Sequence, residues 1–214
     1  MTEQGHAVRA ATAADVDACA EVLALAFQDD PGAIVFEPDP DARRRFLPAF
    51  FQSFVRASLA DGGDLVVPAD GVTGVASWFG PAIHGPTIES LLANGFGDAL
   101  AILGDAGTER LTAMVGEIDA QHDRRTAGRE HLRLEFFGVA PRMQGTGVGL
   151  LLADVGHRRA DVLDIPCYLE TFTIPNVRYY EKRGYRLVGD YPVGDGVPVY
   201  AMERPPQPPG SRGG

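Results

Sequence analysis

The chain has 214 residues, 45% hydrophobic and 22% charged, a composition typical of a globular protein and not of a disordered one. Its formal net charge of −10 argues against nonspecific nucleic-acid binding and is compatible with cationic small substrates, although the charge could equally serve solubility alone. No apolar run approaches the roughly 20 residues that cross a bilayer, and the N-terminus lacks a signal-peptide pattern. We therefore expect a cytoplasmic protein with no membrane partner.

The N-terminal half predicts a short strand followed by mostly helical structure. After the strand at 8–10, Thr12 and Asp15 form a capping-box-like pair ahead of an apolar stripe that ends at Phe27. Residues 29–41 are rich in helix breakers and predict a loop, and apolar spacing predicts a helix over 42–59. Two strands then flank a turn at Asp70-Gly71.

Residues 86–123 predict a helical insertion of two helices separated at 104–107, followed by a basic, solvated turn at 123–130. Two strand–helix pairs follow, with strands at 131–139 and 166–172 and helices at 148–162 and 175–184. Two strands, at 185–193 and 198–204, complete the order. This order indicates an α+β fold with a mixed sheet in one domain, residues 1–204. The tail, 205–214, is too rich in proline and glycine to pack and is expected to be disordered.

The segment VAPRMQGTGVG, residues 139–149, places three glycines at alternate positions between a predicted strand and a predicted helix. Such a turn can build an anion site from backbone N–H groups and the positive end of the helix dipole. A Walker A loop does not fit, because Gly149 is followed by Leu150 and not by lysine. A dinucleotide fingerprint fails as well, because Leu150 stands where a third glycine is needed. A tight packing turn is the alternative.

The frame around these glycines resembles a known family. Residues 144–149, QGTGVG, match the Q/R-x-x-G-x-G/A signature of the GNAT superfamily of N-acetyltransferases, and residues 169–185, LETFTIPNVRYYEKRGY, resemble its second signature. The strong resemblance covers residues 131–189 and is most similar to the puromycin N-acetyltransferase-like branch. It implies a GNAT fold, with a twisted mixed sheet of about six to seven strands, a parallel splayed pair and flanking helices.

The resemblance also implies acetyl-CoA as co-substrate and no metal. The diphosphate would lie on the glycine segment, with help from Arg142 or from Arg158 and Arg159, and the thioester carbonyl would lie near the Val139 N–H. Gly138 suits a bulge or a close approach. The implied coenzyme-binding residues are Phe137, Gly138, Val139, Arg142, Gln144, Gly145, Thr146, Gly147, Val148, Gly149, Asn176 and Tyr180.

Glu135 is the candidate general base, because an alkyl ammonium with a pKa of about 10.4 must lose a proton before it attacks. Strand alternation predicts that Leu132, Leu134 and Phe136 share one face and that Arg133, Glu135 and Phe137 share the other. The alternative is therefore an ion pair between Glu135 and Arg133 without a catalytic role.

Tyr180 is the candidate general acid, since it precedes Glu-Lys where the family commonly places the residue that protonates the coenzyme thiolate. Its alternative role is packing, with the ring in the core and the hydroxyl in water. We expect its neighbour Tyr179 to pack. Asn176 could cap its helix or contact the pantetheine arm.

Glu170 and Trp78 are further candidates for contact with the acceptor, although a structural carboxylate and a packing tryptophan are the plainer interpretations. His84 and His131 are isolated, so no metal site is predicted. Cys19 and Cys167 are expected to be reduced and buried.

Together these features predict an enzyme that acetylates a primary amine of a small, cationic molecule, such as a polyamine, an aminoglycoside or an aminonucleoside, by direct attack in a ternary complex. Two alternatives remain open, a protein N-terminal or lysine acetyltransferase and a non-catalytic CoA-binding sensor. The alanine-, arginine- and glycine-rich usage suggests a bacterial source. A homodimer is possible, with strand 198–204 at an edge or an interface.

Overall fold

The computed structural model describes residues 7–82 and 85–208, so the predictions for His84 and for residues 209–214 lie outside the described part of the chain. Two 3₁₀ turns occur, at Ala13–Asp15 and Pro141–Met143. The strands are β1 (Val8–Ala10), β2 (Asp64–Pro68), β3 (Gly74–Phe79), β4 (Leu132–Val139), β5 (Cys167–Thr171), β6 (Arg186–Val193) and β7 (Val197–Arg204). The helices are α1 (Val16–Phe27), α2 (Pro31–Phe36), α3 (Pro40–Ala60), α4 (Ile88–Ala93), α5 (Phe96–Thr126), α6 (Val148–Leu163) and α7 (Ile174–Glu181).

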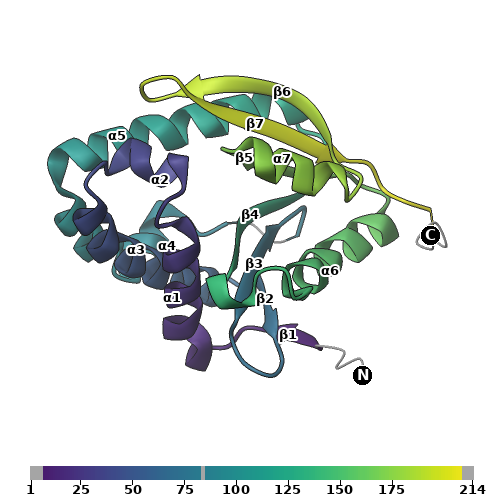
Figure 1. Ribbon diagram of the computed structural model, residues 1–214, viewed down its shortest axis with the longest axis horizontal. Coiled ribbons are helices and arrows are strands. Elements are labelled where there is room, and N and C mark those ends of the chain that lie inside the picture. The colour runs from purple at the N-terminus through teal and green to yellow at the C-terminus, as the bar shows by residue number, and fades with distance from the viewer. Residues whose placement is uncertain (1–6, 83–84, 209–214) are drawn as a thin grey trace.

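These strands form one seven-stranded sheet in the order β1-β2-β3-β4-β5-β7-β6 (Figure 1). β4 and β5 run parallel, with α6 as the crossover between them, and the other neighbouring strands are antiparallel. A mixed sheet with one parallel pair and helices on both faces confirms the predicted fold class.

Helices on the two faces of the sheet divide the core into two clusters. α1, α3 and α5 cover one face, where Leu23 and Phe51 are almost completely buried. α6 and α7 cover the other face, around the buried side chains of Trp78 and Leu152 (Figure 1). The helices of one layer thus come from residues 16–126, and those of the other layer, α6 and α7, come from residues 148–181.

The loop predicted at 29–41 contains a helix, α2. Pro31 occupies its first position, where a proline needs no hydrogen-bond acceptor, and the Asp30 carboxylate accepts a hydrogen bond from the Gly32 N–H at 2.8 Å. A Cβ at Gly32 would lie 2.7 Å from the ring of Phe172, so glycine here permits close packing. The prediction was wrong because it treated residues that start a helix as residues that end one.

The helical insertion is broken at a different place from the one predicted. The chain turns at Gly95, which has a φ of 99°, whereas the predicted break at 104–107 is only a kink at Gly104 within α5. α5 also continues through the predicted turn to Thr126, where the Arg125 guanidinium lies 4.9 Å from the ring centre of Tyr191 in β6. Although α5 is long, no helix of the described residues is both long and apolar enough to cross a membrane.

The C-terminal strand lies inside the sheet. β7 pairs with both β5 and β6, so the prediction that it could form an edge is wrong. Residues 205–208 then follow α6, because the Asp161 carboxylate accepts hydrogen bonds from the Arg204 guanidinium at 2.7 Å and from the Gln207 N–H at 2.8 Å. The start of the tail predicted to be disordered is therefore bound to α6.

The two cysteines are free and buried, one in each core cluster, as predicted. Burial raises the pKa of both Cys19 and Cys167 to about 12. Neither thiol is therefore ionised near neutral pH, and both act as small apolar side chains.

Candidate active site

The parallel strands β4 and β5 separate along their length. They pair at Leu132 with Cys167 and at Arg133 with Tyr168, and they diverge beyond these residues. A cavity of about 730 Å³ occupies the opening and is lined by the later residues of both strands, by α7, by the glycine segment and by apolar residues of α1, α2, α3 and α5. We call it the coenzyme-side cavity. Its volume is typical of a small-molecule site. The separation of β4 and β5 is the splayed parallel pair that the family resemblance implies.

A β-bulge interrupts β4 at Glu135. Ser77 of β3 pairs with Phe136, whereas the next residue of β3, Trp78, pairs with Leu134, so Glu135 is the extra residue. The bulge places Glu135 where β4 and β5 begin to separate.

The bulge inverts the alternation of the residues that follow it. Phe136 packs among the aromatic rings of α1 and α3, with a centroid distance of 5.1 Å to Phe51, while Phe137 shares the face of Leu134 and approaches Tyr179. The predicted alternation is therefore wrong for Phe136 and Phe137, because one inserted residue exchanges the two faces of a strand.

The backbone of β4 beyond the bulge has free hydrogen-bonding positions on the side that β5 has left. The Ala140 N–H donates to the Thr73 carbonyl at 2.9 Å, on the β3 side. Because successive N–H groups of a strand point to opposite sides, the Val139 N–H points into the opening between β4 and β5. The Val139 carbonyl accepts a hydrogen bond from Gln144 Nε2 at 3.3 Å.

Gly138 serves the packing of α1 on the sheet. A Cβ at this position would lie 3.0 Å from the Cβ of Ala26 and 3.1 Å from Cδ2 of Leu23. The close approach predicted at Gly138 is therefore an approach of helix α1. The predicted bulge lies three residues earlier, at Glu135.

The glycine segment turns the chain from β4 into α6. Gly145 and Gly147 have positive φ angles of 78° and 94°, and a Cβ on either would meet nothing within 4 Å. Backbone conformation, not packing, therefore requires glycine at these two positions. Gly149 differs, because its Cβ would lie 3.2 Å from Phe137 Cζ and from Tyr179 Oη.

The N-terminus of α6 is open to the coenzyme-side cavity. Its N-cap is Gly147, and no side chain of the described residues caps the helix. The first N–H groups of a helix have no acceptor within the helix, and the dipole adds partial positive charge there. Gln144, Gly145 and Gly149 line the cavity beside these groups. The arrangement is an anion site of the kind that binds phosphates.

Three of the predicted coenzyme-binding residues do not line this cavity. Arg142 is exposed, Thr146 donates its hydroxyl to the Met143 carbonyl at 2.7 Å, and the Val148 side chain is buried in the core. A ligand on the loop would reach Val148 through its backbone N–H group, whereas the Thr146 N–H donates to the Met143 carbonyl at 3.4 Å.

The arginines further along α6 are engaged elsewhere. Arg158 pairs with Asp154 at 3.0 Å on the same helix, and Arg159 pairs with Asp64 of β2 at 2.8 Å. The structure therefore does not bring either guanidinium to the glycine segment.

Tyr180 lies on α7, lines the coenzyme-side cavity and is only 8% exposed. Its ring packs edge-on against Tyr179 and Tyr185, with centroid distances of 5.2 and 5.4 Å. Burial raises the pKa of its hydroxyl, which therefore stays protonated at neutral pH and is a weaker acid than an exposed tyrosine.

Asn176 does not cap α7. The N-cap is Thr173, whose hydroxyl accepts a hydrogen bond from the Asn176 N–H at 3.3 Å, and the Asn176 side chain donates to Thr171 Oγ1 at 3.0 Å. The predicted capping role is wrong because the helix begins two residues earlier than Asn176. The residue lines the cavity, so a contact with the pantetheine arm stays a prediction.

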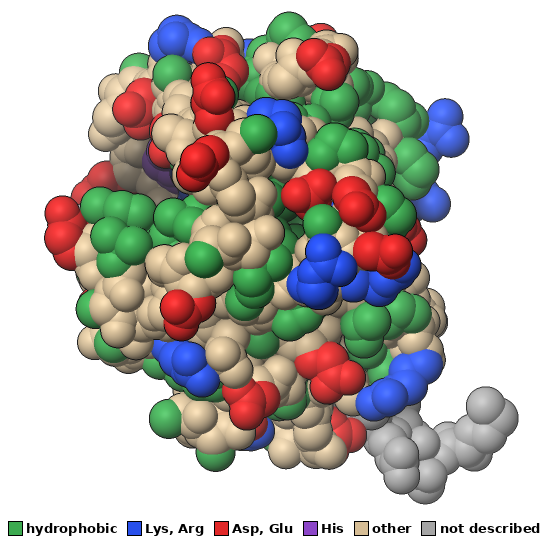
Figure 2. All heavy atoms as spheres, turned by 90° about the vertical axis from the view of Figure 1, so that its left-hand side faces the viewer, with side chains coloured by type: hydrophobic (Ala, Val, Ile, Leu, Met, Phe, Trp, Pro, Cys, Tyr) green, Lys and Arg blue, Asp and Glu red, His purple; other side chains and the backbone are tan. Residues whose placement is uncertain are grey.

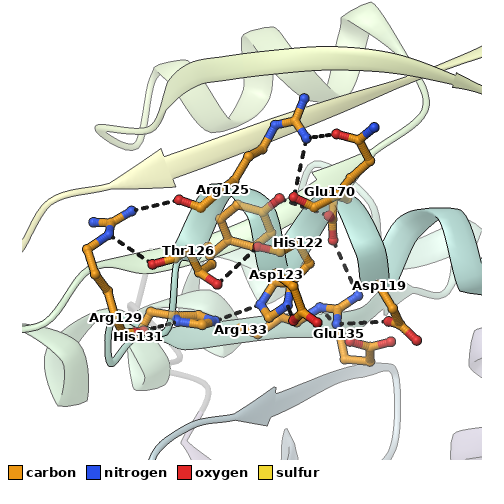
Figure 3. Close-up of polar contacts among 12 residues, drawn as sticks. Asp119, His122, Asp123, Arg125, Thr126, Arg129, His131, Arg133, Glu135 and Glu170 are labelled. Atoms are coloured by element: carbon orange, nitrogen blue, oxygen red, sulfur yellow. Dashed lines mark hydrogen bonds and ion pairs between the residues drawn. The ribbon is translucent and has the colours of Figure 1, made fainter.

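Arg133 lies among three carboxylates beside the bulge (Figure 3). Its guanidinium is 2.9 Å from Glu135, 3.3 Å from Glu170 and 3.6 Å from Asp119. Burial alone would lower the pKa of Arg133, but the three carboxylates together raise it. The ion pair between Arg133 and Glu135, the structural alternative for Glu135, is thus present, and it fixes the position of that carboxylate.

Glu170 is the buried member of this cluster. Its side chain is 6% exposed and accepts hydrogen bonds from the Tyr168 hydroxyl at 2.8 Å and the Tyr191 hydroxyl at 3.2 Å, in addition to Arg133. Burial raises its pKa, although Arg133 and the hydroxyls oppose the shift. Glu135, with 24% of its side chain exposed, is the more accessible carboxylate.

A histidine pair that the sequence does not predict lies beside the cluster (Figure 3). The Nε2 atoms of His122 on α5 and His131 are 2.8 Å apart, and His131 Nδ1 is 2.7 Å from the Arg129 carbonyl. Because a carbonyl only accepts, His131 carries its hydrogen on Nδ1 and, with both rings neutral, accepts one from His122. Burial lowers the pKa of His122. No sequence motif marks the pair, because the two histidines come from separate segments that only the fold brings together.

A second cavity, of about 850 Å³, lies on the α3, α4 and α5 side of the sheet, and we call it the acceptor-side cavity. The residues that line both cavities are Phe50, Leu111, Val115, Asp119, Arg133, Glu135 and Phe136. Ligands in the two cavities can therefore meet at the β4 bulge, next to the Glu135 carboxylate.

Trp78 lines neither cavity. It is completely buried on the α6 face of the sheet, and a Cβ at Gly156 would lie 2.2 Å from its ring. The prediction that Trp78 contacts an acceptor is wrong, because its side chain points to the face opposite the α3 to α5 layer.

No protein-family model matches the chain. Among solved structures, it is similar over 96% of its length to 98% of a histone acetyltransferase HPA2 and related acetyltransferase from Corynebacterium glutamicum, with 27% identity and a TM-score of 0.69. It is also similar to an agmatine N-acetyltransferase (14% identity, TM-score 0.58, 92% of this chain and 97% of that chain). An arylalkylamine N-acetyltransferase 2 from Aedes aegypti gives 13% identity and a TM-score of 0.58 over 95% of this chain and all of that chain. At 13 and 14% identity, the last two similarities show a shared fold and not a shared substrate. The fold, the glycine segment and these neighbours together support an N-acetyltransferase of the GNAT superfamily.

Proposed function

We propose that the protein transfers an acetyl group from acetyl-CoA to a primary amine of a small molecule, by direct attack in a ternary complex. The observation that carries this proposal is the meeting of two cavities at the β4 bulge, one ending at the anion site of α6 and the other of a size suited to a small acceptor. The resemblance of residues 131–189 to the puromycin N-acetyltransferase-like branch is consistent with a small acceptor.

The coenzyme side would bind its ligand largely through the backbone. The N–H groups of Gly145 and of residues 147–149 would receive the diphosphate, and the pantetheine arm would extend along β4 with Asn176 on its other side. The Val139 N–H would donate to the thioester oxygen as negative charge develops on it. Loss of one such donor typically lowers the rate by about 100- to 1000-fold.

On the acceptor side, Glu135 would remove a proton from the ammonium group, through a water molecule where the distance requires it. The free amine nitrogen then attacks the carbonyl carbon and forms the new C–N bond. Arg133 would hold the Glu135 carboxylate in place, and Glu170 would hold Arg133.

Collapse of the tetrahedral intermediate breaks the C–S bond, and Tyr180 would donate its proton to the departing thiolate. A thiolate, whose thiol has a pKa of about 8.5, is a weaker base than a tyrosinate, so Tyr180 would donate its proton as the C–S bond breaks and negative charge develops on sulfur. The tyrosinate would then take the second proton of the acylated nitrogen by way of water. The products are an N-acetylated amine, CoA thiol and one proton released to solvent.

The test is calorimetric titration with acetyl-CoA, followed by thiol release with a panel of small primary amines and a lysine-containing peptide. We expect saturable binding, release with small amines, and a fall in kcat of about 100-fold or more in Tyr180→Phe. Tyr200→Phe, the same change on a tyrosine of β7 that lines neither cavity, is the control and should retain most of the activity.

Three results would contradict the proposal in different ways. Binding without thiol release from any acceptor would indicate a coenzyme sensor. Release with the peptide alone would indicate a protein acetyltransferase. Equal rates in Tyr180→Phe and in the unaltered protein would show that Tyr180 is not the acid.

A further inference from the structure

The acceptor-side cavity has a polar side and an apolar side, which come from different elements. Its polar residues belong to β4, to residues 129–131 that precede it, and to the later part of α5. Its apolar residues come from α3, the end of β3, α4 and the earlier part of α5, and include Phe50, Phe54, Phe79, Leu91, Phe96 and Leu111. A ligand that fills the cavity must therefore present a polar group to β4 and an apolar body to the helices.

Most of the charges on the polar side are paired, but Glu130, which also lines the cavity, is exposed and adds a further carboxylate. Asp119 and Glu135 share the guanidinium of Arg133 with Glu170, and Arg129 pairs with Glu203 at 2.7 Å. A single ammonium group can approach the Glu135 carboxylate there. A second ammonium group further inside would face the apolar wall of the helices, where burial of an unpaired charge is unfavourable.

The net charge of −10 does not change this conclusion. On the face shown in Figure 2, acidic and basic side chains are interspersed and hydrophobic side chains lie between them. On this face, therefore, the acidic charge is mixed with basic charge.

We propose that the preferred acceptor is a primary amine carried on an apolar body, aromatic or branched alkyl, and not a polyamine or an aminoglycoside. This inference rests on the proposed function and specifies its substrate class. Burial of an apolar body against the helices favours binding, whereas the second ammonium group of a polycation would lose its hydration wherever it faces that apolar wall.

The experiment compares 4-phenylbutylamine with agmatine and spermidine by kcat/KM in the thiol-release assay. We expect the phenylalkylamine to be preferred by at least about tenfold, the factor that burial of a large apolar side chain supplies. Thr112 lies on α5, is exposed and lines the acceptor-side cavity only, so a change there leaves the coenzyme side intact. Thr112→Asp should shift the preference toward the dication by about tenfold, and Thr112→Asn, which adds no charge, should not.

A preference of the unaltered protein for agmatine or spermidine, or equal preference ratios in Thr112→Asp and Thr112→Asn, would overturn the inference. Calorimetric binding of the same amines to the CoA-saturated protein gives the preference without turnover. Absence of thiol release would thus contradict the proposed function, while the order of binding affinities would still decide the acceptor class.

Discussion

The two cavities are built in different ways. The coenzyme side depends on backbone, on glycines with positive φ, on the open N-terminus of α6 and on N–H groups of β4 that have no partner strand. The acceptor side depends on side chains, on an apolar wall from three helices and on a buried ion cluster around Arg133. A backbone site tolerates most side-chain changes but not a change of dihedral angle, whereas a side-chain site depends on the partners of each residue.

Removal of Arg133 should have the largest effect on stability. Arg133→Met leaves Glu170 buried without its cation, which we expect to lower the free energy of unfolding by about 3 to 5 kcal/mol. Urea unfolding measures the loss. Arg124→Met, at an exposed arginine paired with Glu117, is the control and should cost less than about 1 kcal/mol.

A second substitution separates an electrostatic loss from a packing loss. Glu170→Gln removes the orphaned charge, so the double variant with Arg133→Met should recover much of the lost stability. If the double variant is as unstable as Arg133→Met alone, the cluster stabilises the fold by packing and not by charge.

Asp30, the N-cap of α2 and part of the coenzyme-side lining, should give a pH dependence. Burial raises the pKa of Asp30 to about 6, whereas an exposed aspartate titrates near about 3.9. The native state therefore favours the protonated carboxyl, so this group supports stability below about pH 4 and that support is lost as the pH rises through about 6. Each pKa unit corresponds to about 1.4 kcal/mol, which limits the effect to about 3 kcal/mol.

Asp30→Asn keeps the cap and removes the charge, so it should be more stable than the unaltered protein above pH 6 and should show a flatter profile between pH 4 and 6. Thermal unfolding across this range measures the difference. Asp39→Asn, at the exposed N-cap of α3, should reproduce the original profile. Parallel profiles for Asp30→Asn and the unaltered protein would rule out this account.

Gly147→Ala should have a smaller effect, confined to the coenzyme side. An alanine at a φ of 94° is strained by about 1 to 2 kcal/mol, so we expect acetyl-CoA affinity to fall by about tenfold with little change in acceptor preference. Gly97→Ala is the matched control, because a Cβ there also meets open space but its φ is that of a helix. Equal affinities in the two variants would show that the turn does not bind the coenzyme.

The coenzyme side could be predicted from the sequence because its requirements act on residue type. Only glycine adopts the backbone of positions 145 and 147 without strain, so the turn appears as a pattern in the sequence. Strand and helix periodicity gave the sheet and the helices of both layers for a similar reason.

The acceptor side could not be predicted in the same way. Many apolar residues could form the wall of α3, α4 and α5, so no pattern marks it. The bulge at Glu135 places Phe136 and Phe137 each on the face opposite the one predicted for it. The bulge depends on the pairing of β4 with β3, which local sequence does not encode. His122 meets His131 because α5 packs beside the start of β4, a tertiary contact that no local pattern shows.

The most direct test is a structure of the protein with bound CoA. We expect the diphosphate oxygens to lie within hydrogen-bond distance of N–H groups between Gly145 and Gly149, and the thiol sulfur to lie close to the Tyr180 hydroxyl. A coenzyme bound away from the N-terminus of α6 would contradict the account.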